Sequence, residues 1–292
     1  MGPLQANLPL SYGVTLLRQA RQLGVNFFDT ADSYETYPVL RAALGHDEGA
    51  IIATKGYAYT ARGARSLVER ARRGLDRDVI DLVLLHEQES ELTLQGHREA
   101  LDYLYEEKLK GTIKAVGVST HHVEVVERAH AWPQIEVIHP LLNVKGLGIQ
   151  DGNREDMESA IATARSHGRG VYAMKALGGG HFYQDAHKAL AYVSSLSWLD
   201  AVAVGVKSEA ELHLDVAWLL GQEGDPHLVR EVQSTSRQLF IEWWCQACGR
   251  CVQHCPFGAL KVVGERARVD GERCLLCGYC AKECPHFCIK VV

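Results

Sequence analysis

A chain of 292 residues suits one large and one small domain, because a single α/β barrel commonly takes about 250 residues. The net charge of −5 gives no electrostatic case for binding to nucleic acid or to an anionic membrane, and no apolar run reaches the ~20 residues of a membrane-spanning helix. All nine cysteines lie from Cys245 onward, which indicates a metal centre rather than a disulfide framework and predicts a reducing, cytoplasmic location.

Amphipathic helices alternate with short, almost wholly apolar strands through the first 220 residues. The predicted helices are 12–23, 37–44, 64–75, 101–109, 123–131, 157–166, 186–196 and 209–220, and the predicted strands are 25–28, 50–55, 79–86, 113–118, 135–139, 171–174 and 201–205. Strands without proline that are apolar throughout are typical of a parallel sheet buried on both faces. We therefore predict an α/β fold, a (β/α)8 TIM barrel whose first strand is incomplete and begins as a stub at residues 1–4.

Three consecutive strands end in side chains that could carry chemistry. Asp29 follows the first apolar run with Tyr34 shortly after it, and Lys55 and His86 end the next two strands. The carboxyl ends of parallel strands meet at one rim of a barrel, so these four side chains are expected to share a site. There Tyr34 could give a proton to a carbonyl oxygen as hydride reaches its carbon. Lys55 would favour the phenolate, Asp29 would hold Lys55, and His86 would orient the carbonyl. The structural alternative is a helix-capping aspartate and a tyrosine packed under a loop.

This constellation resembles the catalytic tetrad of the aldo-keto reductase superfamily over roughly residues 1–220. The matching motifs are Phe28-Asp29-Thr30-Ala31 with Tyr34, Ala53-Thr54-Lys55, Leu84-Leu85-His86, Val116-Gly117-Val118-Ser119, Met174-Lys175-Ala176-Leu177-Gly178-Gly179-Gly180 and Val204-Gly205-Val206-Lys207-Ser208. The resemblance implies a small carbonyl or alcohol substrate and a nicotinamide cofactor that lies across the strand ends. No Gly-x-Gly-x-x-Gly motif follows a predicted strand, as this resemblance also implies.

The positions that hold the cofactor in this superfamily depart from its usual pattern here. The carboxamide positions read Ser119 and Thr120, with His139 where glutamine is common and Asn143 just beyond. Lys207 and Ser208 match the site for the adenosine phosphate. The arginine that often follows is replaced by the segment Leu212-His213-Leu214. The expected cofactor is therefore NADP or NAD.

An internal repeat fills the end of the chain. Cys245-x2-Cys248-x2-Cys251-x3-Cys255-Pro256 recurs 29 residues later as Cys274-x2-Cys277-x2-Cys280-x3-Cys284-Pro285. This spacing resembles that of bacterial-type ferredoxins, small α+β domains with two [4Fe–4S] clusters. The resemblance implies one cluster on Cys245, Cys248, Cys251 and Cys284, and another on Cys274, Cys277, Cys280 and Cys255. Two zinc sites, each with four cysteine ligands, are the alternative. Cys288 aligns with Ala259, so a small buried side chain is expected there.

We expect a barrel over residues 1–222, a linker over 223–240 and a ferredoxin domain over 241–292. The expected function is an oxidoreductase that interconverts a carbonyl and an alcohol by nicotinamide hydride transfer and carries an iron–sulfur electron-transfer domain. One alternative is an electron-transfer protein whose barrel is a docking module without reductase activity and whose clusters serve a redox partner protein. A second alternative is an ordinary reductase whose clusters are only structural.

Overall fold

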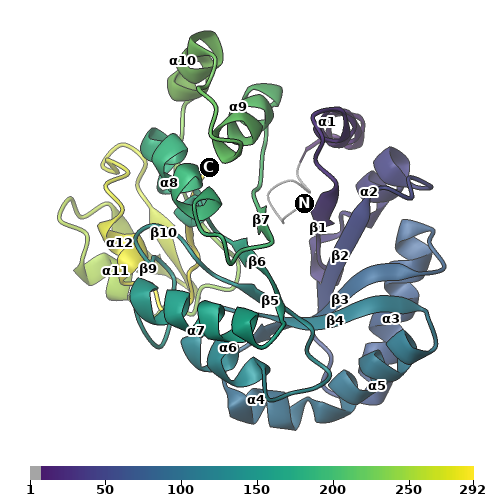
Figure 1. Cartoon of the computed structure of the whole chain (residues 1–292). Coiled ribbons are helices and arrows are strands. Elements are labelled where there is room, and N and C mark those ends of the chain that lie inside the picture. Colours follow the sequence, from purple (N-terminus) through teal and green to yellow (C-terminus); the bar gives the residue numbers. More distant parts are fainter. Residues whose placement is uncertain (1–7) are drawn as a thin grey trace.

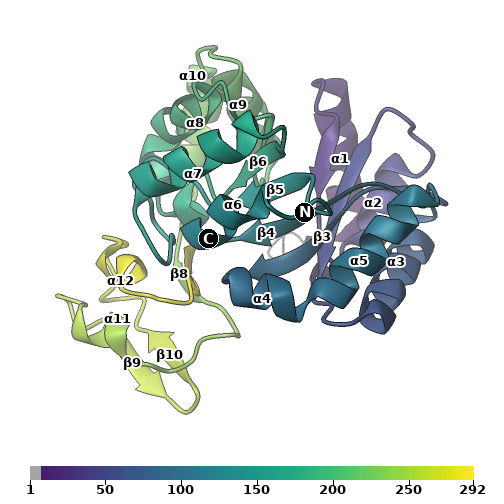
Figure 2. The ribbon, with the colours of Figure 1, turned by 60° about the horizontal axis from the view of Figure 1, so that its bottom comes forward.

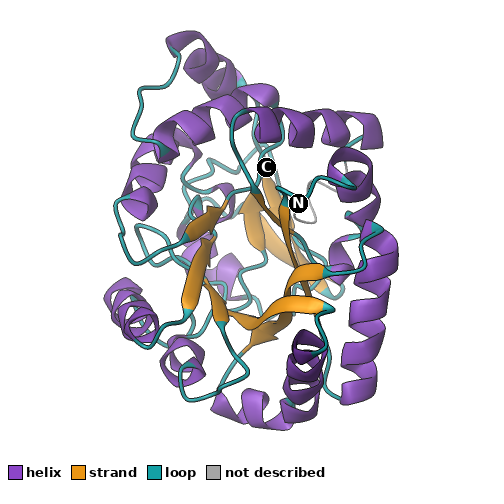
Figure 3. Cartoon of the chain, turned by 45° about the vertical axis from the view of Figure 1, so that its right-hand side comes forward, coloured by secondary structure: helices purple, strands orange, loops and turns teal. Residues whose placement is uncertain are grey.

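Seven parallel strands follow one another in sequence order in a single sheet in the computed structural model, which describes residues 8–292. They are β1 (Phe27–Asp29), β2 (Ile51–Gly56), β3 (Ile80–Gln88), β4 (Ile113–Thr120), β5 (Val137–Pro140), β6 (Gly170–Met174) and β7 (Ala201–Ala203). The two ends of the sheet, β1 and β7, lie against each other, so the sheet curves into a barrel (Figure 3). The predicted α/β barrel is confirmed, and the stub expected at residues 1–4 lies outside the described residues.

Helices connect the strands and surround the sheet (Figures 1 and 3). They are α1 (Leu10–Gln22), α2 (Tyr37–Leu44), α3 (Ala61–Leu75), α4 (Glu91–Gly96), α5 (Arg98–Leu109), α6 (Val123–Ala129), α7 (Arg154–Ser166), α8 (Ala186–Ser194) and α9 (Glu209–Leu219). Three 3-10 turns, η2 (Asp32–Tyr34), η3 (Gly178–Gly180) and η4 (Tyr183–Asp185), lie in the connections. Within residues 8–292 no helix combines the length and the apolarity needed to cross a membrane.

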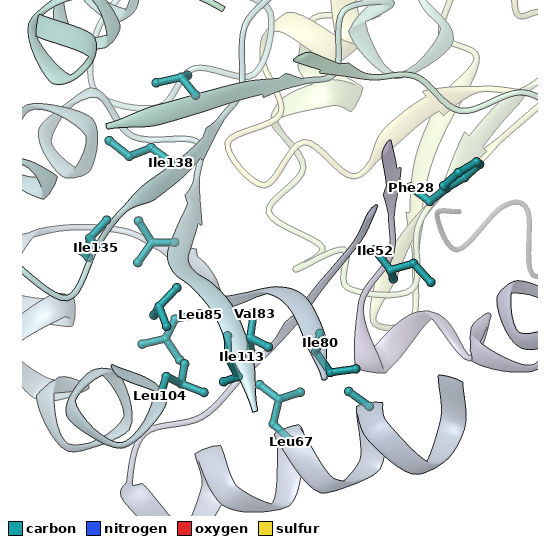
Figure 4. Packing of buried hydrophobic residues seen from close by; sticks show 14 of the residues in the cluster. Phe28, Ile52, Leu67, Ile80, Val83, Leu85, Leu104, Ile113, Ile135 and Ile138 are labelled. Atoms are coloured by element: carbon teal, nitrogen blue, oxygen red, sulfur yellow. The ribbon is translucent and has the colours of Figure 1, made fainter. Parts of the chain in front are cut away.

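Side chains along each strand alternate between the barrel interior and the outer helical layer. The outer layer holds the main core, which includes Phe28, Ile52, Val83, Leu85 and Ile138 from the strands and Leu67 and Leu104 from the helices (Figure 4). The interior is a smaller cluster with Phe27, Ala53, Leu82, Leu84 and Tyr172. Burial on both faces explains why the strands read as continuously apolar.

The cysteine repeat forms a second lobe beside the barrel (Figure 2). Helices α11 (Arg250–Gln253) and α12 (Tyr279–Lys282) occupy equivalent positions in its two copies. Strands β9 (Leu260–Val263) and β10 (Arg266–Val269) form a hairpin, and β8 (Leu239–Ile241) pairs antiparallel with β11 (Ile289–Val291) at the end of the chain. The segment 223–240, expected to be a linker, contains helix α10 (Pro226–Ser234) and the start of β8.

A close contact between neighbouring strands gives a test of the barrel. A Cβ on Gly117 in β4 would lie 2.1 Å from the carbonyl oxygen of Val137 and 2.5 Å from Cδ2 of Leu84. Because a backbone oxygen cannot move aside, Gly117→Ala should lower the free energy of unfolding by about 1–3 kcal/mol in denaturant titrations followed by circular dichroism. Gly96→Ala is the control, since a Cβ there meets nothing within 4 Å. Equal stability of Gly117→Ala and wild type would contradict this packing.

Candidate functional site

A buried ion pair forms the floor of the candidate site. Lys55, at the end of β2, is only 2% exposed, and its Nζ donates to Asp29 Oδ1 at 2.7 Å, to Asp29 Oδ2 at 2.6 Å and to the Thr30 carbonyl oxygen at 2.7 Å. These contacts use all three donors of an ammonium group. Burial is the largest single influence on the pKa of Asp29 and would raise it, but the charges of Lys55 and His139 and the hydrogen bond from Lys55 contribute to an opposite effect that lowers that pKa to about 2.

Tyr34 and His86 face each other above this ion pair. The Tyr34 hydroxyl lies 3.4 Å from Nε2 of His86, and the two rings meet edge to face at 5.8 Å. Nζ of Lys55 lies 5.5 Å from the centroid of the Tyr34 ring. The structure thus brings together the four side chains that the sequence singles out at the strand ends, Asp29, Tyr34, Lys55 and His86.

The protonation of Tyr34 depends on its burial and on the charged groups around it. Burial raises the pKa of Tyr34 well above its ordinary value, and the negative charge of Asp29 raises it further. The Lys55 ammonium bonds to Asp29 and Thr30 rather than to the Tyr34 hydroxyl, so its charge is already compensated. Tyr34 is therefore a neutral phenol that holds its proton when no substrate is bound.

His86 is neutral and held by an aromatic stack. Burial lowers the pKa of His86 well below its ordinary value. The ring of Tyr57, just after β2, stacks on the imidazole at 4.8 Å, and the Tyr57 hydroxyl bonds to the Glu87 carboxylate. Nδ1 of His86 is buried and has no hydrogen-bond partner among residues 8–292. Sequence reasoning missed Tyr57, which lies in a loop where no periodic pattern marks it.

Tyr172 in β6 is a second site residue that sequence reasoning missed. Its hydroxyl donates to Asp29 Oδ1 at 2.9 Å across the barrel. Its ring stacks on His139 at 3.8 Å, and Nδ1 of His139 lies 2.7 Å from the Tyr172 carbonyl oxygen. Strand alternation could have found this residue, because Tyr172 lies on the face of β6 that points into the barrel.

The residues expected to hold the nicotinamide carboxamide are buried and internally bonded. Ser119 Oγ accepts from the Glu87 N–H at 3.0 Å, and Thr120 Oγ1 donates to the Gln88 carbonyl oxygen at 2.7 Å. His139 lies between Tyr172 and Asp29, and burial lowers its pKa to about 3. These three side chains therefore help to build the wall of the barrel at its rim. Asn143, farther on, uses its side chain to hold the turn through Leu147.

Lys207 and Ser208, the predicted phosphate residues, lie at the start of α9. Ser208 Oγ caps this helix by accepting from the Glu211 N–H at 3.1 Å, while the Lys207 N–H donates to Glu211 Oε2 at 2.8 Å. Arg237 reaches the other oxygen of Glu211 at 3.2 Å. An arginine therefore lies beside this helix start, although the local motif lacks one, because the chain returns after α10.

All nine cysteines line two separate pockets. The first pocket is lined by Cys245, Cys248, Cys251 and Cys284 together with Cys288, and the second by Cys255, Cys274, Cys277 and Cys280. Apart from Cys288, each pocket takes three cysteines from one copy of the repeat and one from the other. Among residues 8–292, no three His, Cys, Asp or Glu side chains converge closely enough to hold one metal ion. The division of the cysteines between the pockets matches the two cluster sets that the resemblance to bacterial-type ferredoxins implies.

Backbone geometry repeats together with the cysteines. Ala247 and Leu276, equivalent in the two copies, both have φ near +52°. The N–H groups of Ala259 and Cys288 donate to the sulfurs of Cys255 at 3.3 Å and Cys284 at 3.4 Å. Cys288 is as buried as Ala259, in agreement with the alignment. Its thiol lies 3.5 Å from the Cys284 sulfur, and this contact lowers the pKa of Cys284 to about 5.

The buried ion pair gives a test of the site's stability. Asp29→Asn should lower the free energy of unfolding by about 3–5 kcal/mol at pH 7, because Lys55 would remain buried without its counter-charge. The pKa of Asp29 in the folded protein, about 2, lies below its ordinary value near 4. The contribution is therefore present at neutral pH and lost as the pH falls through this range. The wild type and Asp29→Asn should therefore differ less in free energy of unfolding as the pH is lowered. Guanidinium titrations at pH 7 and at lower pH measure this difference.

The control for this test is Asp32→Asn, in the turn beside the site. Asp32 pairs at 2.8 Å with Arg70, whose side chain is half exposed, so its loss should change the free energy of unfolding by about 1 kcal/mol or less. Equal effects of Asp29→Asn and Asp32→Asn would contradict the structural role assigned to the buried pair.

Comparisons with known proteins show the families to which the two parts of the chain are similar. The family model "Aldo/keto reductase family" matches residues 5–215, and the model "4Fe-4S dicluster domain" matches residues 239–285. A Pseudomonas aeruginosa structure assigned as an aldo-keto reductase is 27% identical, with a TM-score of 0.63 over 73% of this chain and 81% of that one. An aldo-keto reductase from Bacillus halodurans, 19% identical, shares the fold with a TM-score of 0.63 over 78% of this chain and 87% of that one.

Among curated proteins, "Probable aldo-keto reductase 1" of Glycine max is 28% identical over 187 residues. That match covers 58% of this chain and about half, 51%, of the relative's length. The family model matches well over half of the chain, and the tetrad geometry lies within the matched region. The chain therefore belongs to the aldo/keto reductase family and carries a C-terminal 4Fe-4S dicluster domain.

Proposed function

We propose that this protein interconverts a small carbonyl compound and its alcohol by hydride transfer with NADP or NAD. The observation that carries this proposal is the contact of a neutral Tyr34 phenol with a neutral His86 imidazole above the Lys55–Asp29 pair. A proton donor and a hydrogen-bond donor at one barrel rim fit the charge that develops on a carbonyl oxygen during reduction. The C-terminal domain would hold two [4Fe–4S] clusters on eight of the nine cysteines that line the two pockets, all except Cys288.

In this mechanism the bound nicotinamide supplies the hydride. His86 donates a hydrogen bond to the carbonyl oxygen of the substrate and orients it. Tyr34 then gives its hydroxyl proton to that oxygen, and its raised pKa keeps the proton on the phenol until negative charge develops on the substrate. The buried Lys55–Asp29 pair lies beneath the Tyr34 ring and helps to hold it in position. Ser119, Thr120 and His139 would lie nearest the carboxamide of the cofactor, and Lys207 and Ser208 nearest its adenosine end.

The iron–sulfur domain has a separate role in this proposal. A nicotinamide transfers two electrons together as hydride, whereas a [4Fe–4S] cluster takes one electron at a time. We infer that the clusters exchange electrons with a redox partner protein rather than directly with the nicotinamide.

Replacing the proposed acid tests the barrel activity. Tyr34→Phe should reduce carbonyl turnover by about 10²–10⁴-fold and leave nicotinamide binding nearly unchanged, because only the transferred proton is lost. A panel of carbonyl substrates with NADPH and NADH, followed at 340 nm, measures turnover, and fluorescence titration measures binding. Tyr59→Phe is the control, since Tyr59 is 58% exposed and contacts His97 instead of His86. Full turnover in Tyr34→Phe would show that another group supplies the proton.

Metal analysis tests the cluster sites. Protein prepared without oxygen should contain about eight irons and eight sulfides per chain. Cys255→Ser should remove about half of the iron by opening the pocket otherwise formed by the second copy. Cys288→Ser should keep the full content, because Cys288 is not one of the four thiols assigned to either cluster. Zinc in place of iron, with no visible absorbance, would rule out the cluster assignment.

A further inference from the structure

The C-terminal domain is seated on the mouth of the barrel. A Cβ on Gly180, in η3 directly after β6, would lie 2.0 Å from the Val291 carbonyl oxygen, so the two backbones are in direct contact. Nε2 of His181 lies 3.0 Å from the Ile289 carbonyl oxygen. In Figure 2 the C-terminus accordingly lies against the barrel, whereas α11 and α12 lie away from it.

Phe287 extends this contact into the mouth itself. Its ring is 2% exposed and forms one apolar cluster with Leu141 and Met174, at the ends of β5 and β6. His121, just after β4, meets the ring edge to face at 5.9 Å. A side chain of the cluster domain therefore packs against residues at the ends of β5 and β6, beside the strands that carry the candidate site.

The conformation of Phe287 shows that the cluster fold does not require this ring. Phe287 has φ +46°, and the equivalent residue of the first copy is Gly258 with φ +57°. A left-handed backbone is easy for glycine but costs other residues about 1–2 kcal/mol. In the first copy this position is a glycine, which adopts the left-handed conformation without strain. In the second copy it is Phe287, whose backbone is strained there and whose ring contacts the barrel. The ring is therefore retained for its contact with the barrel.

This contact lies across the expected path of the dinucleotide. The predicted carboxamide residues Ser119, Thr120 and His139 end β4 and β5, and the predicted phosphate residues Lys207 and Ser208 follow β7. A molecule that joins these two ends crosses the ends of β5 and β6 and the turn η3. Phe287 covers the first two, and β11 covers the third.

We propose that Phe287 and the nicotinamide dinucleotide compete for one part of the barrel mouth, so that the cluster domain must undock before the cofactor binds. This inference rests on the proposed function, because it concerns the same cofactor. The docked arrangement is then a form of the enzyme closed to nicotinamide, with the cluster domain held against the active site.

The interface between the cluster domain and the barrel contains one group that favours docking and one that opposes it, as expected for a reversible contact. Burial of the Phe287 ring favours docking. Lys290 opposes it: its side chain is 4% exposed, and its Nζ lies 3.2 Å from the Phe287 ring centroid and donates to the Phe287 carbonyl oxygen. Burial lowers the pKa of Lys290 well below its ordinary value, although the charge of Glu242 acts to raise it. Undocking would return this amine to water, which offsets part of the loss of apolar contact.

Nicotinamide titration of the full-length, cluster-loaded protein tests the competition. Phe287→Gly places the residue of the first repeat copy at the same backbone conformation, so the domain should keep its fold and its visible absorbance. Its affinity for NADPH or NADH should rise by at least about tenfold, because binding no longer requires displacement of the ring. Phe257→Ala, an aromatic residue after the other Cys-Pro dipeptide and 39% exposed, should leave that affinity unchanged.

Hydrogen exchange of the wild-type protein gives a second readout that needs no variant. Saturating NADPH or NADH should speed exchange in residues 177–182 and 287–292, which the interface now protects. Equal affinities in all three proteins with unchanged exchange would overturn the competition and leave the proposed function standing. Weaker binding by Phe287→Gly would overturn it too, since the ring would then assist the cofactor. No nicotinamide binding by any of the proteins would instead remove the proposed function, and this inference with it.

Discussion

The interaction on which the barrel depends most is the ion pair between Asp29 and Lys55. It joins β1 to β2, and the Asp29 carboxylate also accepts a hydrogen bond from the Tyr172 hydroxyl of β6. Side chains from distant parts of the sheet are therefore tied together inside the barrel, close to the place where β1 and β7 meet. An ion pair buried this deeply is stable only when its hydrogen bonds are complete, and here the lysine has all three acceptors that it can use. The Asp29–Lys55 ion pair thus both supports the candidate site and holds distant strands of the barrel together.

Much of the barrel could be predicted because local patterns determine it. The helix predicted at 37–44 matches α2 at both ends, and the polar residues at the ends of apolar runs locate Asp29, Lys55 and His86 at one rim. Contacts between residues far apart in the sequence could not be predicted from local patterns. Tyr172 lies 143 residues from Asp29, and the pKa of Tyr34 depends on burial that only the folded chain defines. Helix α4 was missed because it has only six residues, and α10 was missed because Gly224, Pro226, Ser234 and Ser236 favour a linker there.

In the C-terminal domain the repeat located the cysteines, and the resemblance to bacterial-type ferredoxins implied their division into two sets. The informative positions are those where the two copies differ. Phe287 replaces the glycine of the first copy, and Cys288 replaces Ala259. The repeat alone marks both as departures, but only the folded chain shows that the first contacts the barrel and that the second lies beside Cys284. The positions that are alike in the two copies thus form the cluster sites, and a position that differs, Phe287, attaches the domain to the barrel.

The exchange of the fourth cysteine between the two copies has a consequence for how such a domain can arise. A peptide with one copy would offer three thiols to one pocket and a fourth to a different pocket, so it could complete neither. Two such peptides side by side would complete both, each lending its last cysteine to the other. The crossed ligand sets therefore have the form of an intertwined homodimer whose two subunits have become one chain.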